Sequence, residues 1–314
     1  MNVRQVIPRD AIPSIDDPEF DTDYAGDGTD EVVVVEGEPV KAYPVRILNY
    51  HEVVNDDVDD IPLAVTWCPL CGSAVVYERR VGDRTLTFGV SGKLADDDLV
   101  MYDRETDSEW KQSLGHCISG ELEGESLSVV PASLTTYAEF EDAYSDGTVL
   151  QPTVAKSEAA SKTDEPADID YGTNPYQSYF ETDGFGLGAH RGTGQQREWT
   201  RTDLDPKTVV LGIEGGNDAV GFPLPRIEEA GGLVVTTVDD REVVVVSTHD
   251  GLHAFENPPF DLDVTDDGRL VGDGTHWSAV SGQSDDGRSL TRVPSRRLFA
   301  FAWQDDHGGE SFYK

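Results

Sequence analysis

One stretch decides the fold class, and it reads AVTWCPLCGSAVVY over residues 64–77. Two short runs rich in β-branched and aromatic residues, Ala64–Trp67 and Ala74–Tyr77, flank a Cys-Pro-x-Cys-Gly turn. Runs of this kind are typical of strands, and Pro69 and Gly72 are residues that favour chain reversal. The stretch therefore predicts a strand, a turn that carries two cysteines, and a second strand.

Similar runs recur along the chain, separated by Gly, Asp, Asn and Pro. The clearest are Val32–Val35, Leu86–Val90, Leu99–Tyr102, Val209–Ile213, Leu233–Val238 and Val243–Ser247. Helix signals are scarce. One helix is predicted over Arg46–Val54 from its apolar spacing, and another opens at Thr136, where Glu139 completes a capping box. We expect a mainly β protein with a few short helices.

The segment from Val32 to Pro131 recurs weakly between Val209 and Pro294. Matching residues are Pro44 and Pro223, Trp110 and Trp277, and Pro131 and Pro294, whose numbers differ by 179, 167 and 163. The shrinking offset is what deletions in a second copy would produce, although chance similarity between acidic β segments is the alternative. We therefore expect two related β-rich halves from an internal duplication. They are residues 1–153, which carry the cysteine pair, and residues 203–314, a degenerate repeat without it, joined by a polar linker or insertion at 154–202.

The charge is strongly negative. The 314 residues include 61 Asp and Glu but only 24 Lys and Arg, a net charge of −37. Such a surface repels phosphate, which argues against nucleic acid and anionic membranes as partners. The carboxylates are spread along the whole chain, and we interpret them as an adaptation to high salt. The alternative is an acidic protein that works at an ordinary salt concentration.

The sequence shows no apolar segment of signal-peptide length near Met1 and no 18-residue apolar run. We therefore expect a cytoplasmic protein without a transmembrane segment.

The chemistry centres on Cys68 and Cys71. This spacing serves a dithiol/disulfide couple or half of a metal site. A closed zinc site needs four ligands, and no second Cys-x-x-Cys exists. His116 and Cys117 could complete a site for zinc or copper, with His51 as a spare ligand. A third possibility is that the thiols are structural and inert, in a binding or scaffold protein.

On the predicted helix, His51 and Asn55 would share a face. His51 is then either a proton donor or ligand near the cysteines, or a hydrogen-bonded structural residue. Arg46 and His51 are the nearest cations in sequence that could lower a thiol pKa. The stretch with Tyr102, Arg104 and Trp110 offers an ion pair and an aromatic anchor, which are more often structural than catalytic.

Several blocks together resemble a known family. They are IPRDAIP (residues 7–13), AYPVRILNYHEVVND (42–56), TWCPLCGS (66–73), FGVSG (88–92), MYDR (101–104) and YGTNPY (171–176). They are similar to the uncharacterised family called domain of unknown function 3179, and the acidity suggests a haloarchaeal member.

The resemblance implies no established activity. Some members of that family carry selenocysteine in the Cys-Pro-x-Cys-Gly block, which favours redox chemistry over zinc. Many members carry an export leader, so an extracytoplasmic location is the alternative. Cys117 stands where the family has a small residue, which weakens a metal site that depends on it. Because the negative surface repels anionic thiols such as glutathione, we expect a protein thiol or a neutral partner.

Because the net charge is −37, salt should stabilise the fold. Carboxylate repulsion is poorly screened at about 0.01 M salt, where the Debye length is about 30 Å, and well screened above about 1 M, where it is about 3 Å. We expect the urea midpoint of unfolding to rise with KCl across this range. A midpoint that does not change with salt would contradict the adaptation to high salt.

Overall fold

The structure is a computed structural model that describes residues 1–161, 163, 165–192, 197–216, 218–249 and 251–314. Parts of the predicted linker at 154–202 fall outside the described residues. Strands account for 40% of the chain and helix for 14%, so the predicted mainly β class with short helices is confirmed. None of the helices described has the length and apolar character needed to cross a membrane.

The first half of the chain builds two five-stranded sheets. One has the order β1 (Val3–Gln5), β10 (Phe88–Ala95), β11 (Asp98–Asp103), β12 (Glu109–Lys111) and β13 (His116–Ser119). The other has the order β14 (Ser133–Thr136), β3 (Glu31–Val35), β4 (Lys41–Pro44), β15 (Thr148–Leu150) and β2 (Phe20–Asp21). Two-residue strands form the pairs β8 (Arg80–Val81) with β9 (Arg84–Thr85) and β16 (Lys156–Ser157) with β17 (Ala167–Asp168).

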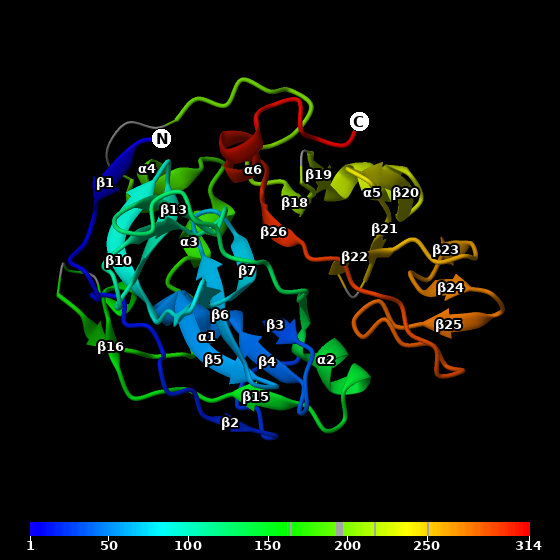
Figure 1. Ribbon diagram of the computed structural model, residues 1–314, viewed down its shortest axis with the longest axis horizontal. Helices are drawn as coiled ribbons and strands as arrows, with labels where there is room; N and C mark the ends of the chain where they lie inside the picture. The colour runs from blue at the N-terminus through cyan, green and yellow to red at the C-terminus, as the bar shows by residue number, and fades with distance from the viewer. Residues whose placement is uncertain (162, 164, 193–196, 217, 250) are drawn as a thin grey trace.

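A six-stranded sheet joins the two halves. Its order is β19 (Ala219–Pro223), β18 (Val209–Glu214), β26 (Arg296–Phe299), β7 (Ser73–Glu78), β6 (Ile61–Cys68) and β5 (Val53–Val58). Figure 1 shows β26, in red, running between the blue and cyan first half and the yellow and orange second half. The second half adds two three-stranded sheets. One has the order β20 (Leu233–Val238), β21 (Arg241–Thr248) and β22 (Gly251–Glu256), and the other has the order β23 (Leu262–Val264), β24 (Leu270–Gly272) and β25 (Thr275–Trp277).

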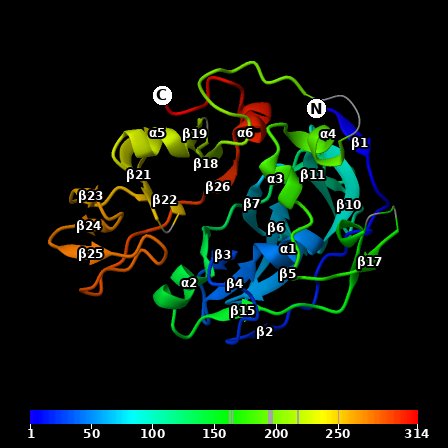
Figure 2. The ribbon, with the colours of Figure 1, turned by 180° about the vertical axis from the view of Figure 1, so that it is seen from behind.

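Six short α-helices occur in the described residues: α1 (Val45–His51), α2 (Tyr137–Ala143), α3 (Gln177–Glu181), α4 (Gly186–Arg191), α5 (Leu224–Glu229) and α6 (Ala300–His307), with a 3₁₀ turn at Glu158–Ala160. Thr136 caps α2 as predicted, because its side chain accepts a hydrogen bond from the Glu139 amide. Figure 2 shows α3 and α4 on the side of the molecule that holds β10 and β11.

The predicted helix over Arg46–Val54 is too long. It ends at His51, because Glu52 adopts a left-handed conformation with φ 59° and its amide closes the last turn on Leu48. Val53 then begins strand β5. The prediction that His51 and Asn55 share a helix face is therefore wrong, since Asn55 lies on the strand.

Residues 31–143 and 209–307 follow a similar order of elements, although the first half also has β1, β2, β8, β9, β13 and β15, which have no counterpart in the second. Each starts with a hairpin whose second strand ends in a proline, Pro44 or Pro223, that caps a short helix. Each continues with two antiparallel meanders and ends with a strand, β14 or β26, that pairs with the first strand of the hairpin and leads into a helix. Trp110 and Trp277 both lie on the third strand of the second meander. This order favours the predicted duplication, which stays a prediction.

The described part of segment 154–202 includes buried side chains. Tyr176, Tyr179 and Phe185 belong to the same apolar core as Cys68 and Cys71. The segment therefore covers the core near the cysteines, in addition to linking the two halves.

A buried ion pair also joins the halves. Lys111 on β12 binds Asp306 on α6, and Ser113 donates a hydrogen bond of 2.6 Å to the same carboxylate. The Lys111 and Asp306 side chains are only 3% and 1% exposed. Two charges this deep stabilise the fold only while they remain together.

Lys111→Met should therefore lower the free energy of unfolding by about 3–5 kcal/mol, because it leaves a buried carboxylate without its cation. The double variant Lys111→Met/Asp306→Leu should recover part of this loss. Arg84→Met, which breaks the exposed pair with Glu121, should have little effect. Urea unfolding of the four proteins checks this, and equal losses for Lys111→Met and Arg84→Met would contradict it.

Candidate functional site

The two cysteines lie at the tip of a β-hairpin, as the sequence predicts. Strand β6 ends at Cys68, β7 begins at Ser73, and these two residues pair across the hairpin. Gly72 closes the turn with φ 54°, a conformation that a glycine adopts without strain. A Cβ at Gly72 would also lie 2.7 Å from the ring of Phe299. The turn therefore depends on a glycine and on the second half of the chain.

Strand β26 holds the turn from the other side. The Phe299 amide donates a 2.8 Å hydrogen bond to the Cys71 carbonyl, and the Arg297 guanidinium donates one of 2.8 Å to the Gly72 carbonyl. The Tyr179 hydroxyl donates one of 2.6 Å to the Leu70 carbonyl. The backbone around the thiols is thus fixed by residues from two distant parts of the sequence, strand β26 and the segment with Tyr179.

Cys68 and Cys71 are free thiols whose side chains approach to 3.8 Å. Both residues are buried, with 2% and 0% exposure. The Cys71 thiol donates a 3.5 Å hydrogen bond to the Asp97 carbonyl. The pair is therefore close enough to react, and it is largely shielded from water.

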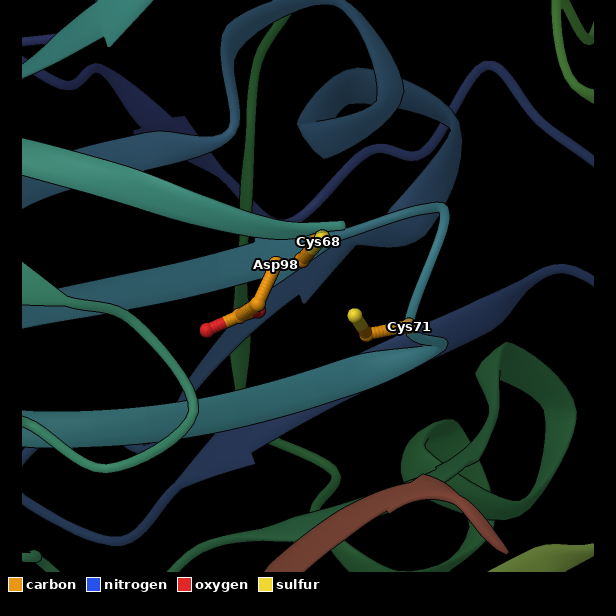
Figure 3. Close-up of side chains that lie close together, drawn as sticks. All are labelled: Cys68, Cys71 and Asp98. Carbon is orange, nitrogen blue, oxygen red and sulfur yellow. The ribbon is translucent and has the colours of Figure 1, made fainter. Parts of the chain in front are cut away.

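Asp98 is the third member of this cluster, which Figure 3 draws. One oxygen of its carboxyl group and the two sulfurs all lie within 4.8 Å of one another. Its Oδ2 accepts a 2.8 Å hydrogen bond from the Ser113 amide, whereas its Oδ1 is buried with no hydrogen-bond partner among the described residues. Burial raises the Asp98 pKa to about 6, although nearby Lys111 opposes the shift.

The environment keeps both thiols protonated. Burial raises the pKa of Cys68, and a hydrogen bond with Cys71 offsets this only in part. Burial also raises the pKa of Cys71, well above its ordinary value. Because a thiolate is the nucleophile in thiol chemistry, these cysteines need a base or a metal ion before they can act.

A cavity of about 60 Å³ opens beside Cys68, enough for a few water molecules or a small chemical group. Cys68 lines it, whereas Cys71 does not. Its apolar wall includes Ile7, Ile12, Val90, Leu94, Leu99 and Leu187, and its polar wall includes Glu52, Lys93, Glu158, Tyr176, His190 and Arg191. A molecule in this cavity would therefore meet Cys68 first.

Glu52 is a buried acid in the wall of this cavity. The amide of Trp67, next to Cys68, donates a 2.8 Å hydrogen bond to the Glu52 carbonyl and so fixes its position. Burial, and to a lesser extent the charges of Glu158 and Asp98, raise the Glu52 pKa to about 8. At neutral pH this side chain is mainly a neutral acid.

The structure gives His51 a structural environment. One ring nitrogen lies 2.8 Å from the Pro13 carbonyl and the other 2.7 Å from the Tyr171 hydroxyl. Burial lowers its pKa, so the ring is neutral at pH 7. The neighbouring residue Glu52, and not His51, lines the cavity.

The other predicted residues also hold the fold together. Arg46 binds the Tyr171 carbonyl and Asp30. Asn55 donates hydrogen bonds to Asp16 and the Phe88 carbonyl and accepts one from the Phe88 amide. The Tyr102 hydroxyl donates a hydrogen bond to the Asp10 carboxylate. Arg104 donates hydrogen bonds to Tyr102 and Ser14 and forms an ion pair with Asp16. The Trp110 indole donates a hydrogen bond to the Asp103 carboxylate. Lys111 and Arg197 are cations whose charges interact with Cys71, in place of the expected Arg46 or His51.

Cys117 and His116 do not join the pair. Cys117, on β13, pairs with Trp110 on β12. Its thiol donates a 3.4 Å hydrogen bond to the Ser119 carbonyl. His116 lies 3.0 Å from the Ser126 hydroxyl. Among the described residues, the group of possible metal ligands around the thiols is Cys68, Cys71 and Asp98.

Sequence reasoning missed Asp98, Glu52 and Lys111. Asp98 ends a run of three aspartates that is typical of a solvated loop. The signal that could have separated it is its position at the start of the apolar run Leu99–Tyr102, which becomes strand β11.

Comparison with known proteins finds one match, to a family whose function is unknown. A family model described as "Protein of unknown function (DUF3179)" matches residues 9–310. The search of curated proteins gives no match, and the search of solved structures gives none either.

Replacing Glu52 should make stability less dependent on pH. Its pKa is raised from about 4.5 to about 8 in the folded protein, so folding binds a proton in this range and stability falls as pH rises from 4.5 to 8. Glu52→Gln should therefore stabilise the protein at pH 8 relative to the wild type by a few kcal/mol, since one pKa unit is worth about 1.4 kcal/mol.

The gain should disappear below pH 4.5, where Glu52 is protonated in both states. Urea unfolding at several pH values measures it, with the exposed Glu125→Gln as control. A gain that is the same at pH 4 and pH 8 would contradict a buried neutral acid.

Proposed function

The chain belongs to the DUF3179 family of proteins of unknown function, and we propose that in this member Cys68 and Cys71 form a thiol–disulfide redox site. The observation that carries this proposal is the approach of the two side chains to 3.8 Å at the tip of one hairpin. A disulfide needs the sulfurs at about 2.05 Å, and side-chain rotation can close most of the difference. The oxidation would convert two thiols into one disulfide and release two electrons and two protons.

The cavity supports different roles for the two cysteines. Cys68 lines it and can meet a partner sulfur, whereas Cys71 lies behind with no exposed surface. Cys68 would therefore form the bond to the partner, and Cys71 would then displace the partner. A cavity this small takes one side chain or a small neutral molecule, so the partner would be a disulfide that reaches in with one sulfur.

The charge of the protein limits the choice of partner. A net charge of −37 disfavours approach of an anionic disulfide at low salt. At low salt we therefore propose a protein or a neutral disulfide as the substrate. We also propose that the protein is haloarchaeal and works in concentrated salt, where this repulsion is screened and the small cavity limits the substrate.

A second candidate is a metal site made by Cys68, Cys71 and Asp98. Two sulfurs bound to tetrahedral zinc at about 2.3 Å lie about 3.8 Å apart. One carboxyl oxygen of Asp98 lies within 4.8 Å of both sulfurs and would be the third ligand. Three protein ligands with an open fourth position suit a catalytic more than a structural zinc ion. The redox proposal is preferred because the described residues offer no fourth ligand.

Oxidation of the purified protein tests the redox proposal. Treatment with a neutral disulfide should remove the mass of two hydrogens from the wild type, and dithiothreitol should restore it. Cys68→Ser and Cys71→Ser should each abolish this reversible change and keep the fold, because the two residues are partners in one bond. Cys117→Ser, the matched control, should behave as the wild type.

Metal analysis of protein purified without chelator separates the two candidates. The redox proposal expects no metal that survives dialysis. One equivalent of zinc that survives dialysis, together with unfolding of both single variants, would overturn it in favour of the metal site.

A further inference from the structure

We propose that a second, larger cavity between the two halves binds an apolar monocarboxylate, such as a medium-chain fatty acid, whose carboxylate pairs with Arg297, with Arg292 as a second positive charge. The inference does not depend on the proposed redox function, because neither Cys68 nor Cys71 lines this cavity.

The size and position of the cavity suit a small-molecule ligand. Its volume is about 320 Å³, which is in the range of pockets that bind small molecules. Its walls come from β3, β14 and β7 of the first half and from β18, β21, β22 and α5 of the second. Strand β26, which Figure 1 shows between the halves, contributes Arg297. Binding sites occur preferentially where two such units meet.

Much of the wall is apolar. Its apolar side chains come from both halves and include Val33, Val76, Leu134, Leu211, Leu224 and Leu252. The last of these, together with Leu134 and Leu224, is only partly buried, so the cavity leaves apolar surface uncovered. A hydrocarbon chain in the cavity would cover this surface and gain about 25 cal/mol for each Å² removed from water.

Arg297 gives the cavity an anchor for an anion. Its side chain is 17% exposed. One guanidinium nitrogen, Nη1, donates a 2.8 Å hydrogen bond to the Gly72 carbonyl, whereas Nη2 approaches the Glu31 carboxylate only to 3.7 Å, too far for a hydrogen bond. Among the described residues, the guanidinium donates no other hydrogen bond. Because a guanidinium has five N–H donors, Arg297 keeps several for a ligand.

Arg292 adds a second positive charge that the protein compensates only in part. Its side chain is 6% exposed, and the carboxylate nearest to balancing it is that of Glu36, which lies 3.5 Å away on a side chain 51% exposed. Burial lowers the pKa of Arg292 in spite of Glu36, although an arginine keeps its charge even so. The carboxylate of a ligand in the cavity would therefore stabilise Arg292.

The acids of the wall do not cancel this preference. Glu31 and Glu228 line the cavity, but both residues are exposed, and water solvates their charges. The buried charges of the wall belong to the two arginines. An arginine binds a carboxylate through charge-assisted hydrogen bonds, which are stronger than those between neutral groups. A carboxylate on an apolar chain thus matches both parts of the wall.

Isothermal titration calorimetry of the full chain with octanoate tests this proposal. The net charge of −37 repels anions at low salt, so the titration is made in about 1 M KCl, where the Debye length is about 3 Å. Octanol and octylamine are the matched ligands, because they have the same chain and a neutral or positive head group. Octanoate should bind with one equivalent per chain, and the other two should bind at least about 10-fold more weakly.

Two variants locate the site. Arg297→Gln removes the charge and should weaken octanoate binding by about 10- to 100-fold, as expected for the loss of charge-assisted hydrogen bonds. Its control is Arg269→Gln, which removes an exposed arginine outside the cavity and should bind like the wild type.

Arg297 also supports the cysteine turn, so a second variant leaves it in place. Ala132→Phe puts a ring into the cavity from a partly buried wall position and should abolish octanoate binding. Ala143→Phe, at a partly buried position of α2 outside the cavity wall, is its control and should bind normally.

Three results would overturn the proposal. The first is no binding of octanoate to the wild type up to about 1 mM, the weak end of specific affinities. The second is equal affinity for octanoate and octanol, which would leave the arginines without a role. The third is undiminished binding in Ala132→Phe, which would place octanoate elsewhere on the protein.

Discussion

The burial of two thiols beside one carboxylate is the constraint on which the rest of the site depends. Removed from water, Cys68 and Cys71 keep their protons, so their chemistry is controlled by the few groups that share their space. Asp98 is the carboxyl group that lies with them, and its charged form is stabilised by Lys111 and disfavoured by Asp306. The site thus differs from thiol pairs at a helix N-terminus, where the helix itself lowers the thiol pKa.

The second half of the chain completes this environment. Strand β26 supports the cysteine turn through Arg297 and Phe299, and α6 supplies the Asp306 that binds Lys111. If the halves arose by duplication, the copy without the cysteines now stabilises the cysteine turn of the other copy. The six-stranded sheet, which includes strands of both halves, is where β26 makes this contact.

The sequence predicts the local features of this protein well, because they depend on neighbouring residues. The hairpin around Cys68 and Cys71, most of the strands and the cap at Thr136 follow from composition and spacing. The sequence alone does not predict the features that depend on tertiary contacts. Apolar spacing alone extends α1 through Val54, whereas the left-handed Glu52 ends it. In sequence, Asp98 resembles the other aspartates of its run, and only the position of strand β11 in the fold places its carboxyl group beside the thiols. His51 is near the cysteines in sequence, but it is hydrogen-bonded to Pro13 and Tyr171.

A crystal structure of the protein after oxidation by a neutral disulfide tests the central claim most directly. The account predicts that the side chains of Cys68 and Cys71, which approach to 3.8 Å in the reduced protein, become joined by a sulfur–sulfur bond of about 2.05 Å. Asp98 should keep its hydrogen bond to the Ser113 amide. Sulfurs that remain apart, with a metal ion bound between them and Asp98, would contradict it.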